Sequence, residues 1–122
     1  MELYKIRNTE HSEGTALVRL ELNPAHAVYQ GHFPGMPVLP GALQVEIIKE
    51  LFAKILDAPL RLDSAKSIKY LGFVVPGEHP VLDVELKYKT TESGYGLRAQ
   101  IRSANDNAPK IFMKFSGQFS KK

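Results

Sequence analysis

The sequence contains no cysteine in its 122 residues. The chain therefore has no thiol nucleophile, no thiolate ligand for a metal and no disulfide framework. A protein without disulfides is compatible with a reducing compartment, and we expect this one to be cytoplasmic.

Long apolar runs are missing as well. The start of the chain, MELYKIRNTE, lacks the apolar core of a signal peptide, and no run approaches the length that crosses a bilayer. The formal net charge is only +3, and no basic stripe is present. We therefore expect neither a membrane nor a nucleic acid as partner, whereas the modest positive charge suits an acidic protein.

What the sequence does contain is typical of one globular domain. Its hydrophobic and charged fractions are 43% and 24%, and it holds no repeat, low-complexity segment or linker. A chain of this length can bury a core without staples, so we expect a single domain over residues 1–122.

Alternating apolar and polar residues predict several strands. The clearest case is VLDVELKYK, in which Leu82, Val84, Leu86 and Tyr88 point to one face and charged residues to the other. A turn signal, TESGYG, separates it from LRAQIR, so these two segments predict a hairpin. We expect further strands over residues 3–7, 16–22, 67–75 and 110–119.

One helix stands out, from Pro40 to about Asp57. Proline suits the first turn of a helix, and Pro59 marks the far end. On a helical wheel the apolar side chains cover a broad arc: Val45, Ile47, Ile48, Leu51, Phe52, Ile55 and Leu56. A single apolar helix among antiparallel strands predicts an α+β fold in which the sheet wraps the helix.

The most informative stretch is GHFPGMPVLPGALQVEII, residues 31–48. It places His32 in a glycine- and proline-rich loop, Gly41 in the first turn of the helix and Glu46 inside the helix. Taken alone, His32 could be a hydrogen-bonded surface residue and Glu46 a solvated one. Gly41 needs a reason, because glycine costs about 1 kcal/mol relative to alanine inside a helix. One reason is the close approach of a ligand to its backbone N–H.

Together, these three residues fit the removal of water from a 3-hydroxyacyl thioester. The reaction needs a base for the α-proton, an acid for the departing hydroxyl and a donor for the charge on the thioester oxygen. His32 suits the first task, because a reference pKa of about 6.5 leaves a histidine largely neutral at physiological pH. Glu46 suits the second if its site keeps it protonated, and the N–H of Gly41, at the positive end of the helix, suits the third.

The same stretch resembles the signature of the β-hydroxyacyl-acyl-carrier-protein dehydratases of bacterial fatty-acid synthesis. The pattern is a histidine after glycine, then P-G-x-P-x-x-P-G, with an acidic residue fourteen positions beyond the histidine. A second segment, FVVPGEHPVLDVEL, resembles a weaker pattern of the same family. The likeness therefore runs from about Asn23 to the C-terminus.

This resemblance implies a hotdog fold, with one long central helix wrapped by a curved antiparallel sheet of five to six strands. It implies that His32 and Glu46 are catalytic and meet across the interface of a homodimer; related proteins also form trimers of dimers. The N–H of Gly41 would bind the thioester carbonyl, beside Pro40 and Phe33, although Phe33 could instead only wedge the loop. Acyl carrier protein would present the substrate on its phosphopantetheine arm, and no metal or other cofactor is implied.

Three departures from the family pattern stand out. The chain starts almost directly with strands, Met36 takes the place of a frequent arginine, and Glu50 that of a usual glutamine. Glu50 either helps to keep Glu46 protonated or simply faces water beside Lys54. These differences leave the reaction type standing. They make a dedicated pathway for a polyene or another specialised acyl product an option beside general fatty-acid synthesis.

The remaining charged and histidine residues carry weaker signals. His11, His26 and His79 have no partners at ligand spacing, so we expect no metal site. Five basic residues surround the helix end and the strand after it, and they either attract an acidic carrier protein or merely solubilise the chain: Lys49, Lys54, Arg61, Lys66 and Lys69.

Rival functions exist within the same fold. A hydratase acting on coenzyme A thioesters and a dehydratase that also isomerises the double bond are the nearest, and a thioesterase fits less well because it would need a positioned water. A non-catalytic subunit that binds acyl chains or pairs with an active partner belongs to another class. The presence of both His32 and Glu46 argues against it, since such a subunit has no need of either.

Overall fold

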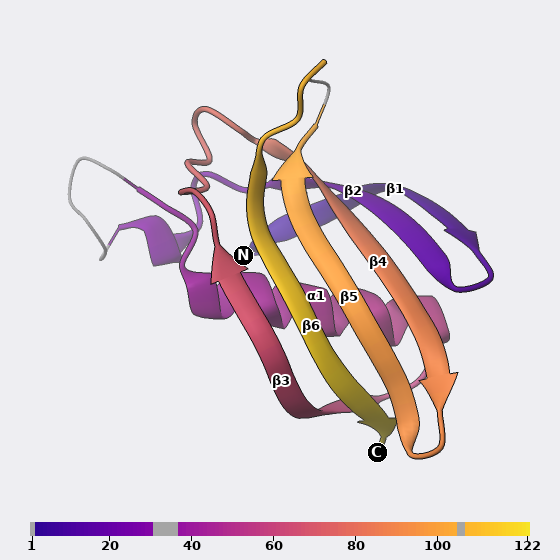
Figure 1. Ribbon diagram of the computed structural model, residues 1–122. Helices are drawn as coiled ribbons and strands as arrows, with labels where there is room; N and C mark the ends of the chain where they lie inside the picture. The colour runs from indigo at the N-terminus through magenta and orange to yellow at the C-terminus, as the bar shows by residue number, and fades with distance from the viewer. Residues whose placement is uncertain (1, 31–36, 105–106) are drawn as a thin grey trace.

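The computed structural model describes residues 2–30, 37–104 and 107–122. Within these ranges one long helix lies against one face of a six-stranded antiparallel sheet with the strand order β1-β2-β4-β5-β6-β3 (Figure 1). The elements in chain order are β1 (Tyr4–Ser12), β2 (Thr15–Leu22), the short 3-10 helix η1 (Ala27–Tyr29), α1 (Gly41–Leu56), β3 (Leu60–Tyr70), β4 (Val81–Thr91), β5 (Gly94–Ser103) and β6 (Ile111–Lys121). The predicted α+β class is confirmed.

The helix α1 begins and ends within a residue of the predicted bounds. Pro40 precedes its first turn with a φ of −58°, the angle that a proline ring imposes and that suits a helix start. At the other end Asp57 adopts a left-handed conformation with a φ of 50°, and its N–H donates back to the last turn. The buried face of α1 carries Ile47, Ile48, Leu51 and Phe52, and it also carries the polar Gln44.

The core lies between α1 and the inner face of the sheet. Phe52 is the aromatic centre, with ring centroids 5.3 Å from Tyr88 and 5.1 Å from Phe119. The alternation predicted for β4 and β5 is confirmed by their register, because Leu86 lies opposite Ala99 on the buried face. Burying a large apolar side chain stabilises a fold by about 1.5–3 kcal/mol, so this layer fixes the helix across the sheet.

Two strands differ from their predicted ranges. The strand expected over residues 67–75 is β3, which runs from Leu60 to Tyr70; the one expected over residues 3–7 is β1, which runs on to Ser12. Both are edge strands whose side chains are mostly exposed, so little apolar alternation marks them. Beyond Tyr70 the chain leaves the sheet, and the carbonyl of the buried Val74 accepts the N–H of Leu39 instead.

Candidate active site

A groove of about 550 Å³ lies where α1 begins and β3 ends. We call it the helix-start groove. One wall comes from the start of the helix and the segment before it, and the other from Tyr70 and the residues after it. Its lining is Val38, Leu39, Pro40, Gly41, Gln44, Tyr70, Leu71, Gly72 and Phe73. Apart from the amide of Gln44 and the hydroxyl of Tyr70, these side chains are apolar or absent, so the groove suits an apolar ligand.

Gly41 lies directly against the ring of Tyr70. A Cβ added at Gly41 would come within 2.6 Å of the ring atom Cζ and within 2.7 Å of the hydroxyl oxygen. This packing gives a structural reason for glycine at that position, beside the ligand contact expected from the sequence. Tyr70 is half exposed, and partial burial raises the pKa of its phenol.

The first turn of α1 leaves backbone donors for a ligand. Leu43 and Gln44 donate to the carbonyl of Pro40, but no side chain caps the helix and no acidic residue lies in its first turn. Among the described residues, nothing accepts a hydrogen bond from the N–H of Gly41. A free N–H at the positive end of a sixteen-residue helix favours a partial negative charge, such as that on a polarised carbonyl oxygen.

Glu46 does not line the helix-start groove of its own chain. It lies five residues beyond Gly41, which turns it about 140° around the helix axis. Its side chain is 54% exposed, and its Oε1 accepts a hydrogen bond from Nζ of Lys49 at 3.1 Å. Glu50 is also exposed and accepts a hydrogen bond of 2.8 Å from the hydroxyl of Tyr4. The structure therefore brings Pro40 and Gly41 together and leaves Glu46 on a different side of the helix.

His32 and Phe33 lie outside the described residues. The catalytic role of His32, the substrate contact of Phe33 and the donor role of Gly41 all stay predictions. Pro40 lines the groove, but its contact with substrate and the catalytic role of Glu46 also stay predictions.

Of the nine residues that line the groove, sequence reasoning named only Pro40 and Gly41 as site residues; among those it missed are Gln44, Tyr70 and Phe73. Phe73 is 66% exposed, the highest value among the large apolar side chains of the described chain. A signal existed for Gln44, because it lies three and four residues before Ile47 and Ile48 and so interrupts an apolar stripe with an amide. Tyr70 and Phe73 carry no such signal, since their meeting with the helix start depends on the path of β3.

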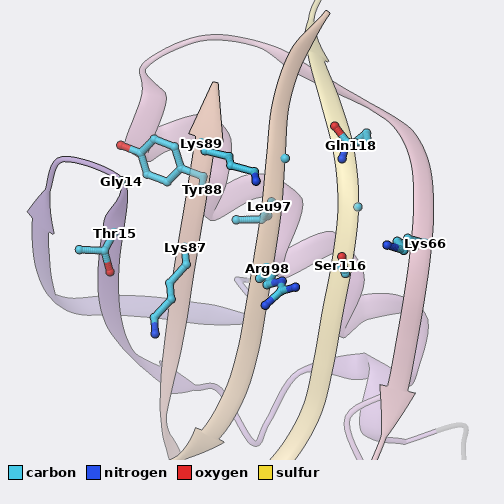
Figure 2. Close-up of a pocket in the computed structure, with 12 residues that line it drawn as sticks. Gly14, Thr15, Lys66, Lys87, Tyr88, Lys89, Leu97, Arg98, Ser116 and Gln118 are labelled. Carbon is cyan, nitrogen blue, oxygen red and sulfur yellow. The ribbon is translucent and has the colours of Figure 1, made fainter. Parts of the chain in front are cut away.

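A second, more open groove lies on the outer face of the sheet, away from the helix (Figure 2). Four cationic side chains line it: Lys66, Lys87, Lys89 and Arg98. Figure 2 shows Lys66 pointing from β3 toward β6 and Lys89 running from β4 toward β5. Its lining includes neither a carboxylate nor a histidine. It offers no acid–base pair, so we do not place the chemistry there.

Three histidines of the described chain have local partners. His26 accepts the N–H of Val28 at 3.0 Å and so caps η1, which is a structural role. Nε2 of His11 and the hydroxyl of Tyr88 are 2.7 Å apart, and His79 packs against the ring of Phe112. Within the described ranges, no three His, Cys, Asp or Glu side chains gather as a metal site would need. Nor is any described helix both long and apolar enough to cross a membrane.

Comparison with curated proteins points to dehydratases. The chain is 30% identical over 76 residues to the 3-hydroxyacyl-[acyl-carrier-protein] dehydratase FabZ of Clostridium acetobutylicum, covering 57% of this chain and 54% of that protein. It is 34% identical over 91 residues to FabZ of Latilactobacillus sakei subsp. sakei, covering 66% and 63% of the two chains. The matched region thus spans about half to two thirds of the length of these relatives.

Solved structures share the arrangement of helix and sheet. The dehydratase heterocomplex ApeI:P from Xenorhabdus doucetiae matches with a TM-score of 0.75 and 18% identity, covering 99% of this chain and 100% of that chain. The E. coli PaaI protein matches with a TM-score of 0.67 and 13% identity over 98% of this chain and 79% of that chain. At such identities the likeness shows the fold alone, and it confirms the hotdog fold expected from the sequence.

The family itself follows from a longer match. The profile of the ApeI-like family, described as ApeI dehydratase, matches residues 8–108. That range includes most of the sheet, all of α1 and the whole lining of the helix-start groove. On this evidence the chain belongs to the ApeI-like dehydratase family.

Proposed function

We propose that this protein removes water from a 3-hydroxyacyl thioester and yields the trans-2-enoyl thioester. The observation that carries the proposal is the N–H of Gly41 at the start of α1, which donates to no described residue and lies at a largely apolar groove. Family membership supports the same reaction class. We further propose that the protein acts in the cytoplasm and that its substrate is attached to the phosphopantetheine arm of acyl carrier protein.

The reaction needs stabilisation of negative charge on the thioester oxygen. When the α C–H bond breaks, its electron pair moves toward the carbonyl and the oxygen gains charge. The N–H of Gly41 donates to that oxygen, and the helix dipole adds to the effect. Because the groove is lined mainly by apolar groups, this hydrogen bond competes with less water than it would on an open surface.

Two side chains would move the protons. His32 takes the proton from the α-carbon, and Glu46 gives a proton to the 3-hydroxyl. The C–O bond then breaks, the double bond forms between the α- and β-carbons, and water leaves. In its own chain Glu46 is exposed and paired with Lys49, and the proposed acid role requires a drier setting than this.

A second subunit provides such a setting. Since Glu46 does not line the helix-start groove of its own chain, we propose that Glu46 completes the groove of a neighbour, opposite His32 of the partner subunit. The exposed Ile68 of the edge strand β3, with the exposed Leu71 and Phe73 just after the strand, offers an apolar surface beside the groove. We propose a homodimer, which could assemble further into a trimer of dimers.

The name of one structural neighbour favours a second form of assembly, in which two different chains pair. The ApeI:P complex is described as a dehydratase heterocomplex, so this chain could pair with a different hotdog chain instead of a second copy. In that case one of the two chains could be non-catalytic. A hydratase acting on coenzyme A thioesters is the alternative that uses the same residues.

The reaction is tested with purified protein and a 3-hydroxyacyl carrier protein. Mass spectrometry should show the loss of one water from the acyl group, and His32→Ala and Glu46→Gln should each abolish that loss. The same assay with the matching coenzyme A thioester separates the carrier-dependent enzyme from the hydratase-type alternative. Full activity of either variant would show that the catalytic roles are wrong.

The shared site has its own test. Mixing the inactive His32→Ala and Glu46→Gln proteins, with exchange of subunits, gives mixed dimers in which one of the two sites has both wild-type groups. Random exchange should restore about one quarter of wild-type activity. If exchange of subunits is verified and the mixture stays inactive, the site does not combine groups from two chains.

A further inference from the structure

The amide of Gln44 is the one carboxamide in the lining of the helix-start groove. Gln44 is only 3% exposed, although the positions around it on the helix are filled by apolar residues. Burying an amide is unfavourable unless both its donor and its acceptor find partners. The hydrogen-bond partners of the Gln44 amide therefore indicate why a glutamine occupies this position.

Half of the amide has a clear partner. Its Nε2 donates to the carbonyl of Leu39 at 3.2 Å, which ties the helix to the segment before it. This bond also fixes which way the amide faces, because the reverse orientation would place Oε1 against the carbonyl oxygen of Leu39, acceptor against acceptor.

The other half has none. Oε1 of Gln44 is buried and accepts no hydrogen bond from any residue in the described part of the chain. A structural role for Gln44, that of holding Leu39, accounts for the nitrogen and leaves the oxygen unexplained. A buried acceptor without a donor carries a penalty, and a ligand that brings the donor removes it.

We propose that Gln44 is a specificity-determining residue whose Oε1 accepts a hydrogen bond from the 3-hydroxyl of the substrate acyl chain. This inference rests on the proposed function, because it needs a 3-hydroxyacyl chain in the helix-start groove. Of the substrate and its product, only the substrate carries a hydroxyl donor at that carbon. The amide oxygen thus favours the molecule that reacts over the one that must leave.

The position of Gln44 agrees with this role. It lies three residues after Gly41, so it is the next residue on nearly the same side of the helix, about 4.5 Å further along the axis. In a 3-hydroxyacyl thioester the hydroxyl lies two carbons beyond the carbonyl. With the thioester oxygen at the N–H of Gly41, an acyl chain that runs along the helix brings this hydroxyl to the amide of Gln44.

The test compares two ligands that differ only in the hydroxyl. Amide-linked analogues serve as probes: 3-hydroxyoctanoyl-pantetheine amide and octanoyl-pantetheine amide, in which the less acidic α-proton of an amide prevents elimination. Calorimetry should show that wild-type protein binds the hydroxylated analogue about tenfold more tightly, the equivalent of ~1.4 kcal/mol. Gln44→Met, which keeps the side chain's length without its amide, should bind both analogues equally.

Two further variants distinguish the role of Oε1 as a hydrogen-bond acceptor from a purely structural role of Gln44. A buried, protonated carboxyl can donate to Leu39 and still present an oxygen, so Gln44→Glu should keep the preference at a pH where that carboxyl is neutral. The same substitution on the outer face of the sheet, Gln118→Met, should leave the preference at its wild-type value. Loss of the Leu39 contact alone would weaken the binding of both analogues by the same factor.

The outcomes separate a failure of the role proposed for Gln44 from a failure of the proposed function. If wild-type protein binds both analogues equally, or if Gln44→Met keeps the preference, Gln44 does not read the hydroxyl and the acyl site itself stands. If wild-type protein binds neither analogue and also fails to dehydrate a 3-hydroxyacyl thioester, the proposed function is wrong and the role of Gln44 falls with it. Binding of the octanoyl analogue by Gln44→Met shows that this variant is folded, even if loss of the Leu39 contact weakens that binding.

Discussion

The ring of Tyr70 packs so closely on Gly41 that even a methyl group at Gly41 would come within 2.6 Å of the ring atom Cζ. The contact joins the end of the edge strand β3 to the first turn of α1. It fixes one wall of the helix-start groove against the other. The side chain of Tyr70, 29 positions away in the sequence, therefore leaves room only for glycine at position 41.

Gly41→Ala should therefore destabilise the protein by about 1–3 kcal/mol, because the new methyl group displaces the Tyr70 ring. In a Tyr70→Ala background the same change should cost nothing or stabilise slightly, since alanine is the better helix former. Urea unfolding of the four proteins in this double-mutant cycle measures the coupling. An equal cost in both backgrounds would mean that Tyr70 is not the reason for the glycine.

The ion pair between Arg19 and Asp83 should matter more than other ion pairs of the sheet. Both guanidinium contacts are short, at 2.9 and 3.1 Å, and the side chain of Asp83 is only 10% exposed. Arg19→Met leaves that largely buried carboxylate without this partner and should lower the free energy of unfolding clearly. Adding Asp83→Asn should recover part of the loss.

A second cross-strand ion pair, which joins β1 to β2, is a matched control. Arg7 and Glu21 are 3.8 Å apart, with side chains 57% and 36% exposed, so Arg7→Met should change the free energy of unfolding by less than about 0.5 kcal/mol. Thermal or urea unfolding of both variants makes the comparison. Equal costs for Arg19→Met and Arg7→Met would contradict the importance given to burial.

The phenol of Tyr29 should make the fold sensitive to alkaline pH. Burial raises the pKa of Tyr29 to about 12 from an ordinary value of 10.0, so between these values the unfolded chain loses the proton and the folded chain keeps it. The stability that this group contributes is complete below about pH 10 and is lost as the pH rises toward 12. Tyr29→Phe should remove this part of the alkaline loss, about 1–3 kcal/mol.

Urea midpoints of wild-type and Tyr29→Phe protein at about pH 8 and about pH 11 provide the measurement. At the lower pH the two proteins should be nearly equal, because the hydroxyl of Tyr29 has no hydrogen-bond partner within the described ranges and little is lost with it. A parallel decline of both proteins with pH would assign the alkaline loss to other groups.

The proposed dimer predicts a difference between the two edges of the sheet. Ile68 on β3 and Ile6 on β1 are both 38% exposed, yet only β3 borders the helix-start groove. Ile68→Ser should raise the dissociation constant of the dimer at least about tenfold, because each copy loses buried apolar area. Ile6→Ser should leave it unchanged. Light scattering over a range of protein concentrations distinguishes the two, and equal effects would place the interface elsewhere.

Much of the fold could be predicted because its signals are local. Two prolines delimit α1, and regular alternation marks β4 and β5, which lie inside the sheet and bury one face. The same reasoning misplaced β3 by several residues. An edge strand with exposed side chains on both faces has no apolar period, and the residues just after it, Leu71 to Phe73, line the helix-start groove instead of extending the strand.

The site could be predicted only where a motif names its residues. Gly41 and Glu46 stand out by type and spacing, and Pro40 by its place before the helix. Tyr70 and Phe73 could not be found this way, because they reach the groove through the tertiary path of β3. No local pattern tells whether Glu46 reaches the groove of another subunit, since that depends on contacts between chains.

The outer face of the sheet sets a limit on how these molecules can aggregate. There, Lys87 lies directly opposite Arg98, and Lys69 opposite Lys114, so like charges face each other in register across neighbouring strands. Two such faces brought to the ~10 Å spacing of stacked sheets would repel each other within one Debye length. In dilute buffer this repulsion opposes face-to-face stacking of the sheets of neighbouring molecules. High salt screens the repulsion, so face-to-face precipitation should begin at high salt.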